Sequence, residues 1–294
     1  MDFNTALKVK LNEVFQFTID FLNSHNLRWF VGYGTAIGAV RHHGIIPWDD
    51  DIDIIMPRED YDRLLSIRDE LKATKYSIIC MGDDKYWLPF AKFIDTTTTI
   101  WEYANIPCII GVYVDVFPLD PSSLDFEEYN TAHKMLYYLY KAYEVKQTEF
   151  ELKPYISKLL HTHFGTVIHD IKIDSQRLRS LKSITKKILV LNQKVYDPKG
   201  EKMICSVVPL RIKGYFERSW FDSYVEMQFE SYFVKVPSGY DEYLTMVYGD
   251  YMTPPPVNKR VLTHEGERYY CNLEEGLTLA QVKQRIMKGE KLVY

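Results

Sequence analysis

Apolar positions at helical spacing open the chain. Residues 4–24 carry large apolar side chains every three or four positions, so they predict an amphipathic helix with one buried face, formed by Leu7, Leu11, Val14, Phe15, Phe21 and Leu22. A short apolar strand is predicted over 27–31, and Gly32 and Gly34 end it. A second, short helix is then predicted over 35–41.

Runs with a period of two follow. Acidic and apolar residues alternate over 51–56, which predicts a strand that ends at Pro57, and 58–71 returns to helical spacing. Further β-branched or aromatic runs predict separate strands over 76–81, 88–94, 98–103 and 112–117. We expect Pro118 and Pro121 to end the last of these strands.

The second half of the chain has a different pattern. Residues 124–192 contain little glycine and predict mostly helices, whereas 217–236 predicts strands with alternating aromatics and 240–247 a short helix. The segment TPPPVNKR at 253–260 predicts an irregular loop, because three consecutive prolines lack amide donors. The whole pattern predicts an α+β fold, a mixed sheet with an inserted helical subdomain.

Composition narrows the class of protein. A hydrophobic fraction of 46% is typical of a globular chain, and a net charge of −4 argues against a general nucleic-acid binder. The four cysteines show no zinc spacing, so we expect reduced, structural thiols. No signal-peptide pattern and no run of 18 apolar residues is present, which predicts a cytoplasmic location. Contact with a membrane surface is compatible with a cytoplasmic location if the molecule on which the protein acts is linked to a lipid.

The strongest chemical pattern is WDDDIDI, from Trp48 to Ile54. In a strand Asp51 and Asp53 face the same side, and Asp49 joins them if the extended conformation begins early. Carboxylates this close repel by roughly 4 kcal/mol per pair at 4 Å in a medium of dielectric near 20, so protons or a cation must relieve the repulsion. Oxygen ligands favour Mg²⁺ or Mn²⁺. An isolated D-x-D can also be a solvated strand end, but here acids cluster.

Asp115 is the candidate third ligand of the metal. In VYVDVF the valines at 112, 114 and 116 share one face of the predicted strand and leave Asp115 on the other. The alternative role is structural, with Asp115 capping a turn in the following FPLDP.

A glycine turn lies just before the acids. In GYGTAIGAVR, Gly34 permits close backbone approach and Thr35 supplies a hydroxyl at a helix N-terminus, an arrangement that suits phosphate. Taken alone the glycine spacing is weak and fits a plain tight turn equally well. Arg41 either pairs with a donor phosphate or neutralises Asp49 or Asp50.

Three more basic residues are candidates for substrate binding. Lys92 points away from Ala91 and Phe93 and reaches the pocket, or it is a solvated lysine at a sheet edge. Arg260 and His264 follow the proline loop and either ring the mouth of the site or lie on a solvated face.

Three blocks of this sequence resemble the LicD family of phosphocholine transferases, which also includes relatives of fukutin and fukutin-related protein. They are GYGTAIGAVRHHGIIPWDDDIDIIMPREDYDRLL, GVYVDVFPLD at 111–120 and VPSGYDEYLTMVYGDYMTPPPVNKRVLTH at 236–264. The resemblance implies a nucleotidyltransferase-like core over 1–121, a helical insertion over 122–215 and a part that completes the catalytic domain over 216–294. It also implies that Gly34 and Thr35 contact phosphate and that Asp51, Asp53 and Asp115 bind metal.

The resemblance implies a reaction as well. A glycan hydroxyl attacks the distal phosphorus of a CDP-linked donor such as CDP-choline, so that phosphocholine or a related phospho-alcohol is transferred to a cell-surface glycan or its lipid-linked precursor. We expect Asp115 to bind metal and Asp49 to be the candidate base. Two alternatives remain open: transfer of NMP from an NTP to a small acceptor, and a non-enzymatic module that binds sugar or choline through its many aromatics.

Overall fold

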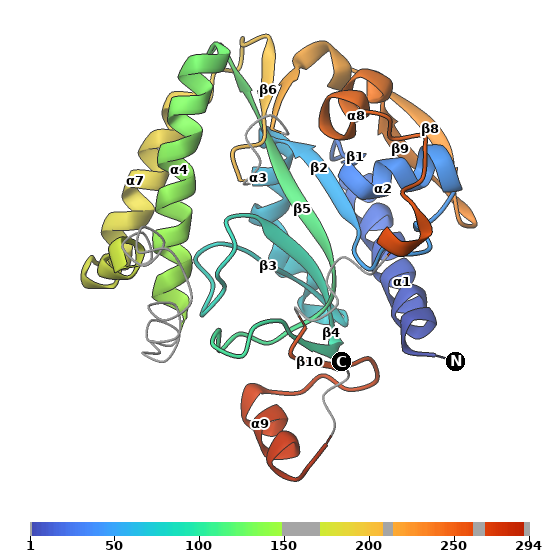
Figure 1. Cartoon of the computed structure of the whole chain (residues 1–294), viewed down its shortest axis with the longest axis vertical. Helices are drawn as coiled ribbons and strands as arrows, with labels where there is room; N and C mark the ends of the chain where they lie inside the picture. The colour runs from blue at the N-terminus through green and yellow to red at the C-terminus, as the bar shows by residue number, and fades with distance from the viewer. Residues whose placement is uncertain (1, 149–170, 208–213, 261–267, 291–294) are drawn as a thin grey trace.

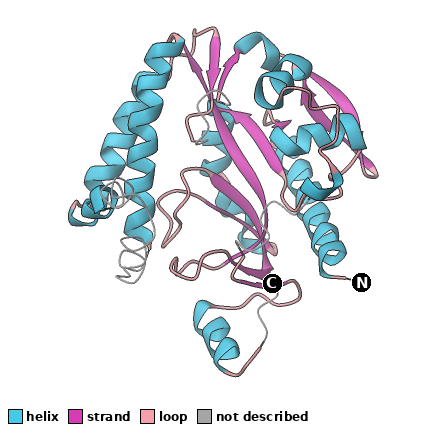
Figure 2. Ribbon diagram, viewed as in Figure 1, coloured by secondary structure: helices cyan, strands magenta, loops and turns pink. Residues whose placement is uncertain are grey.

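The fold is a mixed β-sheet with helices on its flanks (Figures 1 and 2). The computed structural model describes residues 2–148, 171–207, 214–260 and 268–290. Helices α4 and α7 lie side by side at one flank, and α1, α2 and α8 lie at the other (Figure 1). The helices span Phe3–Ser24 (α1), Tyr33–Ile37 (α2), Arg58–Ser66 (α3), Phe126–Gln147 (α4), Leu181–Val195 (α7), Tyr240–Tyr248 (α8) and Leu279–Met287 (α9).

Short helical turns extend or separate these helices. A π-helical turn over Gly38–His42 continues α2, and the remaining turns are 3₁₀. The 3₁₀ turns span Arg68–Ala73, Ser175–Leu178, Arg218–Phe221 and Val257–Lys259. Among the described helices, none is long and apolar enough to cross a lipid bilayer.

The sheet has the main order β1-β2-β5-β4-β10, with β2 and β5 parallel and their other neighbours antiparallel. Strand β3 also pairs with β4, β6 pairs with the end of β5, and β8 and β9 form a separate hairpin. The strands span Phe30–Val31 (β1), Asp53–Pro57 (β2), Tyr76–Ile79 (β3), Ala91–Trp101 (β4), Ile110–Ser122 (β5), Lys202–Ile204 (β6), Tyr215–Glu217 (β7), Tyr224–Phe229 (β8), Tyr232–Pro237 (β9) and Tyr270–Asn272 (β10).

The α+β class and the amphipathic first helix are confirmed. The buried face of α1 contains Leu7, Leu11, Val14, Phe15 and Leu22, as the spacing predicts. All four cysteines are buried and form no disulfide. The helices predicted over 124–192 correspond to α4 and α7 where the structure describes the chain.

Two predictions about strands were wrong. Residues 88–94 and 98–103 do not form separate strands, because β4 runs from Ala91 to Trp101 through an irregularity after Asp95. Pro118 and Pro121 do not end β5, which continues to Ser122. Each proline lies where β5 is paired on one side only, with β2 at Pro118 and with β6 at Pro121, and an edge position tolerates a residue that lacks an amide donor.

The division into 1–121, 122–215 and 216–294 stays a prediction. Strand β6, which falls inside the predicted insertion, pairs with the last residues of β5. The loop predicted over TPPPVNKR is irregular apart from its single 3₁₀ turn.

Candidate active site

Parallel pairing of β2 and β5 brings two predicted site residues together. Asp53 and Asp115 are partners in the register of these strands, and the Asp115 amide donates to the carbonyl of Ile52 at 2.8 Å. Neighbouring strands lie about 4.8 Å apart and paired residues face the same side, so both carboxyls lie on one face of the sheet. A turn-capping role for Asp115 is wrong, because FPLDP continues the strand.

The acids before β2 lie in a loop, because the strand begins at Asp53 and not at Asp51 as predicted. Carboxylate oxygens of Asp49, Asp50 and Asp51 lie within 4.8 Å of one another. Asp50 is turned to Arg268, whose guanidinium donates to its carboxylate at 2.8 Å and to its carbonyl at 2.7 Å, with both side chains 1% exposed. Asp49 and Asp51 instead line a cleft together with Asp53.

Lys92 lies beside Asp115. Its ammonium donates to Asp115 Oδ1 at 2.7 Å, lies 3.8 Å from Glu102 Oε1 and stands 3.3 Å from the centroid of the Tyr113 ring. Strand β4 is paired on both sides and Lys92 is buried, so the alternative of a solvated lysine at a sheet edge is wrong. The lysine contacts Asp115 but is not among the residues that line the cleft, so its role in substrate binding stays a prediction.

Burial and mutual repulsion set the protonation of the paired acids. Burial raises the pKa of Asp53 well above its ordinary value, and the charges of Asp51, Asp115 and Asp49 raise it further while Lys92 lowers it. Burial raises the pKa of Asp115 to about 6, against the opposing effect of Lys92. A cation among these groups would stabilise their ionised forms.

The glycine turn packs directly on the acids. Thr35 Oγ1 accepts a hydrogen bond from the Asp53 amide at 2.8 Å, and a Cβ added to Gly34 would lie 2.8 Å from Asp49 Oδ2. Tyr33 adopts φ of +44°, and its amide donates to the Tyr243 hydroxyl at 2.8 Å. The turn therefore fixes the start of β2, and Gly34 lines the cleft.

Two guanidinium groups meet at Trp48 on the rim of the cleft. Arg41 donates to the carbonyl of Tyr251 and lies 6.0 Å from the Trp48 ring, and Arg260 lies 4.8 Å from the same ring. Burial lowers the pKa of Arg41, and the charge of Arg260 lowers it further. Asp50 forms its ion pair with Arg268 and not with Arg41, which was one of the partners that the sequence predicted. His264 lies outside the described residues.

The cleft has a volume of about 470 Å³ and joins the glycine turn, the acids and the loop after α8. Sequence reasoning missed Tyr248, which lines it, and whose pKa is raised by burial and by the charges of Asp53, Asp49 and Asp51. It also missed Glu102 and Arg268. The YGD segment pointed to Tyr248, whereas nothing in the sequence pattern singles out an arginine 218 residues from its partner Asp50.

Comparison with known proteins finds one family and three relatives that this chain resembles. The family model described as "LicD/FKTN/FKRP, nucleotidyltransferase domain" matches residues 26–167. The lipopolysaccharide cholinephosphotransferase LicD of Haemophilus influenzae is 26% identical over 83% of this chain and 89% of its own. An uncharacterized protein of Rickettsia prowazekii is 36% identical over 24% of this chain and 26% of its own, and one of Rickettsia typhi is 37% identical over 24% and 23%. The matched domain and the Haemophilus influenzae relative support a member of the LicD family, which is a family of transferases.

Proposed function

We propose that this chain transfers phosphocholine, or a related phospho-alcohol, from a CDP-linked donor to a hydroxyl of a cell-surface glycan or its lipid-linked precursor. The observation that carries the proposal is the composition of one cleft: acids on its floor from β2 and its preceding loop, and two guanidinium groups at Trp48 on its rim. The name of the Haemophilus influenzae relative supports phosphocholine as the transferred group and lipopolysaccharide as an acceptor class.

The rim and the floor suit different parts of such a donor. Burial and the nearby charge of Arg260 lower the pKa of Arg41, and an anionic pyrophosphate beside the two guanidinium groups would relieve their repulsion. The Trp48 face, already in contact with both guanidinium groups, offers a flat surface for a base or a sugar ring. We therefore place the donor phosphates between Trp48 and the acids.

The donor set fits a divalent cation. The acids supply oxygen ligands only, and carboxylate oxygens of Asp49, Asp50 and Asp51 lie within 4.8 Å of one another. Burial raises the pKa values of Asp53 and Asp115, and the charge of Asp51 raises both further, so a cation would stabilise the ionised carboxylates. We assign Mg²⁺, or Mn²⁺, to Asp51, Asp53 and Asp115. When bound, such an ion neutralises charge on the donor pyrophosphate and the departing CMP.

The remaining residues would position the reacting groups. Thr35 holds β2 in place through the Asp53 amide, and Lys92 holds the Asp115 carboxylate through one oxygen, which leaves the second free to act as a ligand. Asp49, which lines the cleft beside Gly34, is our candidate base for the acceptor hydroxyl. Gly34 keeps the backbone close enough to the acids for a phosphate to contact both.

The decisive experiment follows the fate of the donor. We expect the purified protein to release CMP slowly from CDP-choline in the presence of Mg²⁺, faster with a lipopolysaccharide acceptor, and not after chelation. Phosphorus NMR would identify the products. Release of pyrophosphate from an NTP, with CDP-choline left intact, would instead support NMP transfer, and no turnover of either donor class would overturn the proposal.

A further inference from the structure

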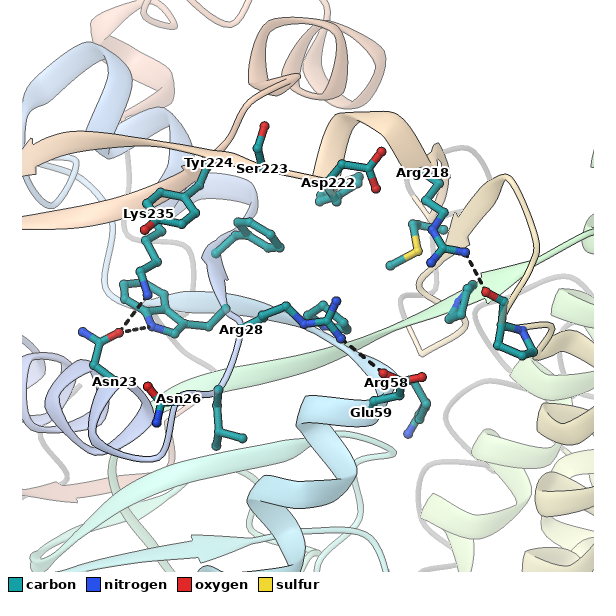
Figure 3. Close-up of a pocket in the computed structure, with 18 residues that line it drawn as sticks. Asn23, Asn26, Arg28, Arg58, Glu59, Arg218, Asp222, Ser223, Tyr224 and Lys235 are labelled. Atoms are coloured by element: carbon teal, nitrogen blue, oxygen red, sulfur yellow. Dashed lines mark hydrogen bonds and ion pairs between the residues drawn. The ribbon is translucent and has the colours of Figure 1, made fainter.

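A second pocket of about 530 Å³ lies at the opposite end of β2 from the acids (Figure 3). Pro57 from the end of β2, Arg58 from the start of α3 and Pro121 from the end of β5 line it, and it shares no residue with the acid cleft. Asp53 and Pro57 stand at the two ends of β2, so about 13 Å of strand separates the two sites. Its size is in the range of sites for small ligands.

One side of this pocket holds a lysine among neutral groups. Lys235 Nζ donates to Asn23 Oδ1 at 2.9 Å and stands 5.2 Å from the ring centroids of both Trp29 and Tyr224. The same Asn23 oxygen accepts a hydrogen bond from Trp29 Nε1 at 3.0 Å, so one oxygen positions both the lysine and the tryptophan. Among the residues that the structure describes, no carboxylate forms an ion pair with Lys235. Burial accordingly lowers the pKa of this lysine, and the charge of Glu226 only partly opposes the effect.

The other side of the pocket holds an arginine that also forms no ion pair with a carboxylate of the described residues. Arg218 donates to the carbonyls of Pro198 and Gly200 at 2.8 and 3.0 Å, and no carboxylate of the described chain forms an ion pair with it. Figure 3 shows Lys235 and Arg218 on opposite sides of the pocket, with Arg28 between them. The two remaining arginines are compensated: Arg28 pairs with Asp60, and Arg58 with Asp120.

The rest of the lining selects among anionic ligands. Phe30 and Phe221 supply buried apolar rings, and Tyr224 offers a ring that is 49% exposed. Glu59 and Asp222 also line the pocket, and their carboxylates would repel a polyphosphate but accept hydrogen bonds from hydroxyls. A ligand that has an apolar ring face, hydroxyls and a single acidic group satisfies all of these features.

We propose that this pocket binds an anionic saccharide, a sugar that carries a phosphate or a carboxylate, between Lys235 and Arg218. The further assignment, that this sugar is a distal part of the acceptor glycan while the acid cleft holds the donor, rests on the proposed function. A glycan that reaches both sites must span several sugar units, because the pocket lies at the far end of β2. The pocket would therefore select acceptors by a group remote from the reacting hydroxyl.

Direct binding tests the site without any turnover. Calorimetry and saturation-transfer NMR would measure glucose 6-phosphate against glucose and inorganic phosphate, with CMP as competitor. We expect the sugar phosphate to bind more tightly than either component and to persist when CMP is added. Lys235→Gln and Arg218→Gln should each weaken it about tenfold, since a hydrogen bond to a charged group is lost. Lys283→Gln is the matched control, because Lys283 faces a different tryptophan, Trp101, at 5.8 Å.

Three results would overturn the inference: equal affinity in wild type and both variants, displacement of the sugar phosphate by CMP, or inorganic phosphate binding as tightly as the sugar phosphate. Thermal unfolding of each variant would exclude a folding defect, and Arg218→Gln gives a second readout if Lys235→Gln unfolds. With a glycan acceptor, Arg218→Gln should raise the acceptor KM and leave slow donor hydrolysis unchanged. If wild type lacks turnover but binds the sugar phosphate, the proposed function fails and the pocket stands; if turnover is intact and binding is absent, the pocket fails alone.

Discussion

At the scale of single residues, the acid cleft concentrates carboxylates that have few cationic partners of their own. Asp50 is compensated by Arg268 and Asp115 by Lys92, but Asp53 is half-buried, and burial together with three neighbouring acids raises its pKa. The ionised form of such a carboxyl is destabilised by its neighbours, and a perturbed pKa of this kind is common in functional sites. Removing the charge of Asp53 by mutation is therefore the most informative single substitution.

We predict that Asp53→Asn lowers phosphocholine transfer by at least about a hundredfold, because metal-mediated stabilisation is worth several kcal/mol. Without metal, its melting temperature should equal or exceed that of wild type, since a repelled carboxylate has been removed. Asp62→Asn is the control, because the Asp62 side chain is 62% exposed on α3. Turnover near the wild-type rate at saturating Mg²⁺ would show that Asp53 is not a ligand.

The buried ion pair of Lys92 gives a second test. Lys92→Met should reduce the free energy of unfolding by about 3–5 kcal/mol at pH 8, because Asp115 is left buried and unpaired. The double variant Lys92→Met/Asp115→Asn should recover part of this loss. Lys72→Met, which breaks an exposed pair with Asp69, should have a much smaller effect because solvent screens that pair. Urea unfolding would measure all of these, and a double variant no more stable than the single one would contradict the pairing.

At the scale of elements, the irregularity in β4 depends on one carboxylate. Asp95 Oδ1 accepts from the Thr97 amide at 2.9 Å and from its hydroxyl at 2.6 Å, and Oδ2 accepts from Lys75 at 2.8 Å. On the paired strand, a Cβ at Gly111 would lie 1.8 Å from the Asp95 carbonyl, so only glycine allows this close approach.

The lowered pKa of Asp95 leads us to predict that the stability of the fold depends on pH. Burial raises the pKa of Asp95, but the hydrogen bonds from Lys75 and Thr97 outweigh burial and lower it below 3.8. A lowered folded pKa stabilises the fold above the unfolded pKa, and this stabilisation is lost as the pH falls through the folded value. Asp95→Asn should therefore be less stable than wild type at pH 6, with the difference shrinking below about pH 4. Denaturant titrations across this range would measure it, with the exposed Asp20→Asn as control; a constant difference would contradict the assignment.

The elements also show what the sequence could predict. Period-two alternation located Asp53 and Asp115 on their strands, and the parallel register of β2 and β5 makes the two residues partners. Proline signals misled at Pro118, because whether a strand has a neighbour on each side is a property of the sheet and not of the local sequence. Arg268 was missed for the same reason: its partner Asp50 is brought near by the fold alone.

At the scale of the whole molecule, the helical flank carries a surface that the catalytic proposal does not use. A groove between α4 and α7 is lined by five cations and by no acid among its described residues: Lys134, Arg179, Lys186, Lys187 and Lys194. Two exposed apolar residues line the same groove, Met135 at 54% exposed and Val190 at 44%. Cations alternating with exposed apolar groups on a helical surface are typical of segments that lie on an anionic bilayer.

We expect the peripheral membrane contact predicted from the sequence to use this α4–α7 surface. Each lysine near an anionic bilayer contributes about 1 kcal/mol, so Lys186→Glu/Lys187→Glu should weaken binding to phosphatidylglycerol vesicles at least about tenfold, as measured by co-sedimentation. The control is Lys10→Glu/Lys72→Glu, which changes net charge equally but away from the groove. Binding should fall as salt is raised, because the attraction is screened beyond about 10 Å at 0.1 M. Equal binding to neutral phosphatidylcholine vesicles, or equal loss in the control, would show that the surface does not dock on anionic lipid. If this flank held the enzyme at the bilayer, it would keep the cleft close to a lipid-linked acceptor. The surface would then affect membrane binding and not the reaction itself, so donor turnover in detergent should be the same in both double variants.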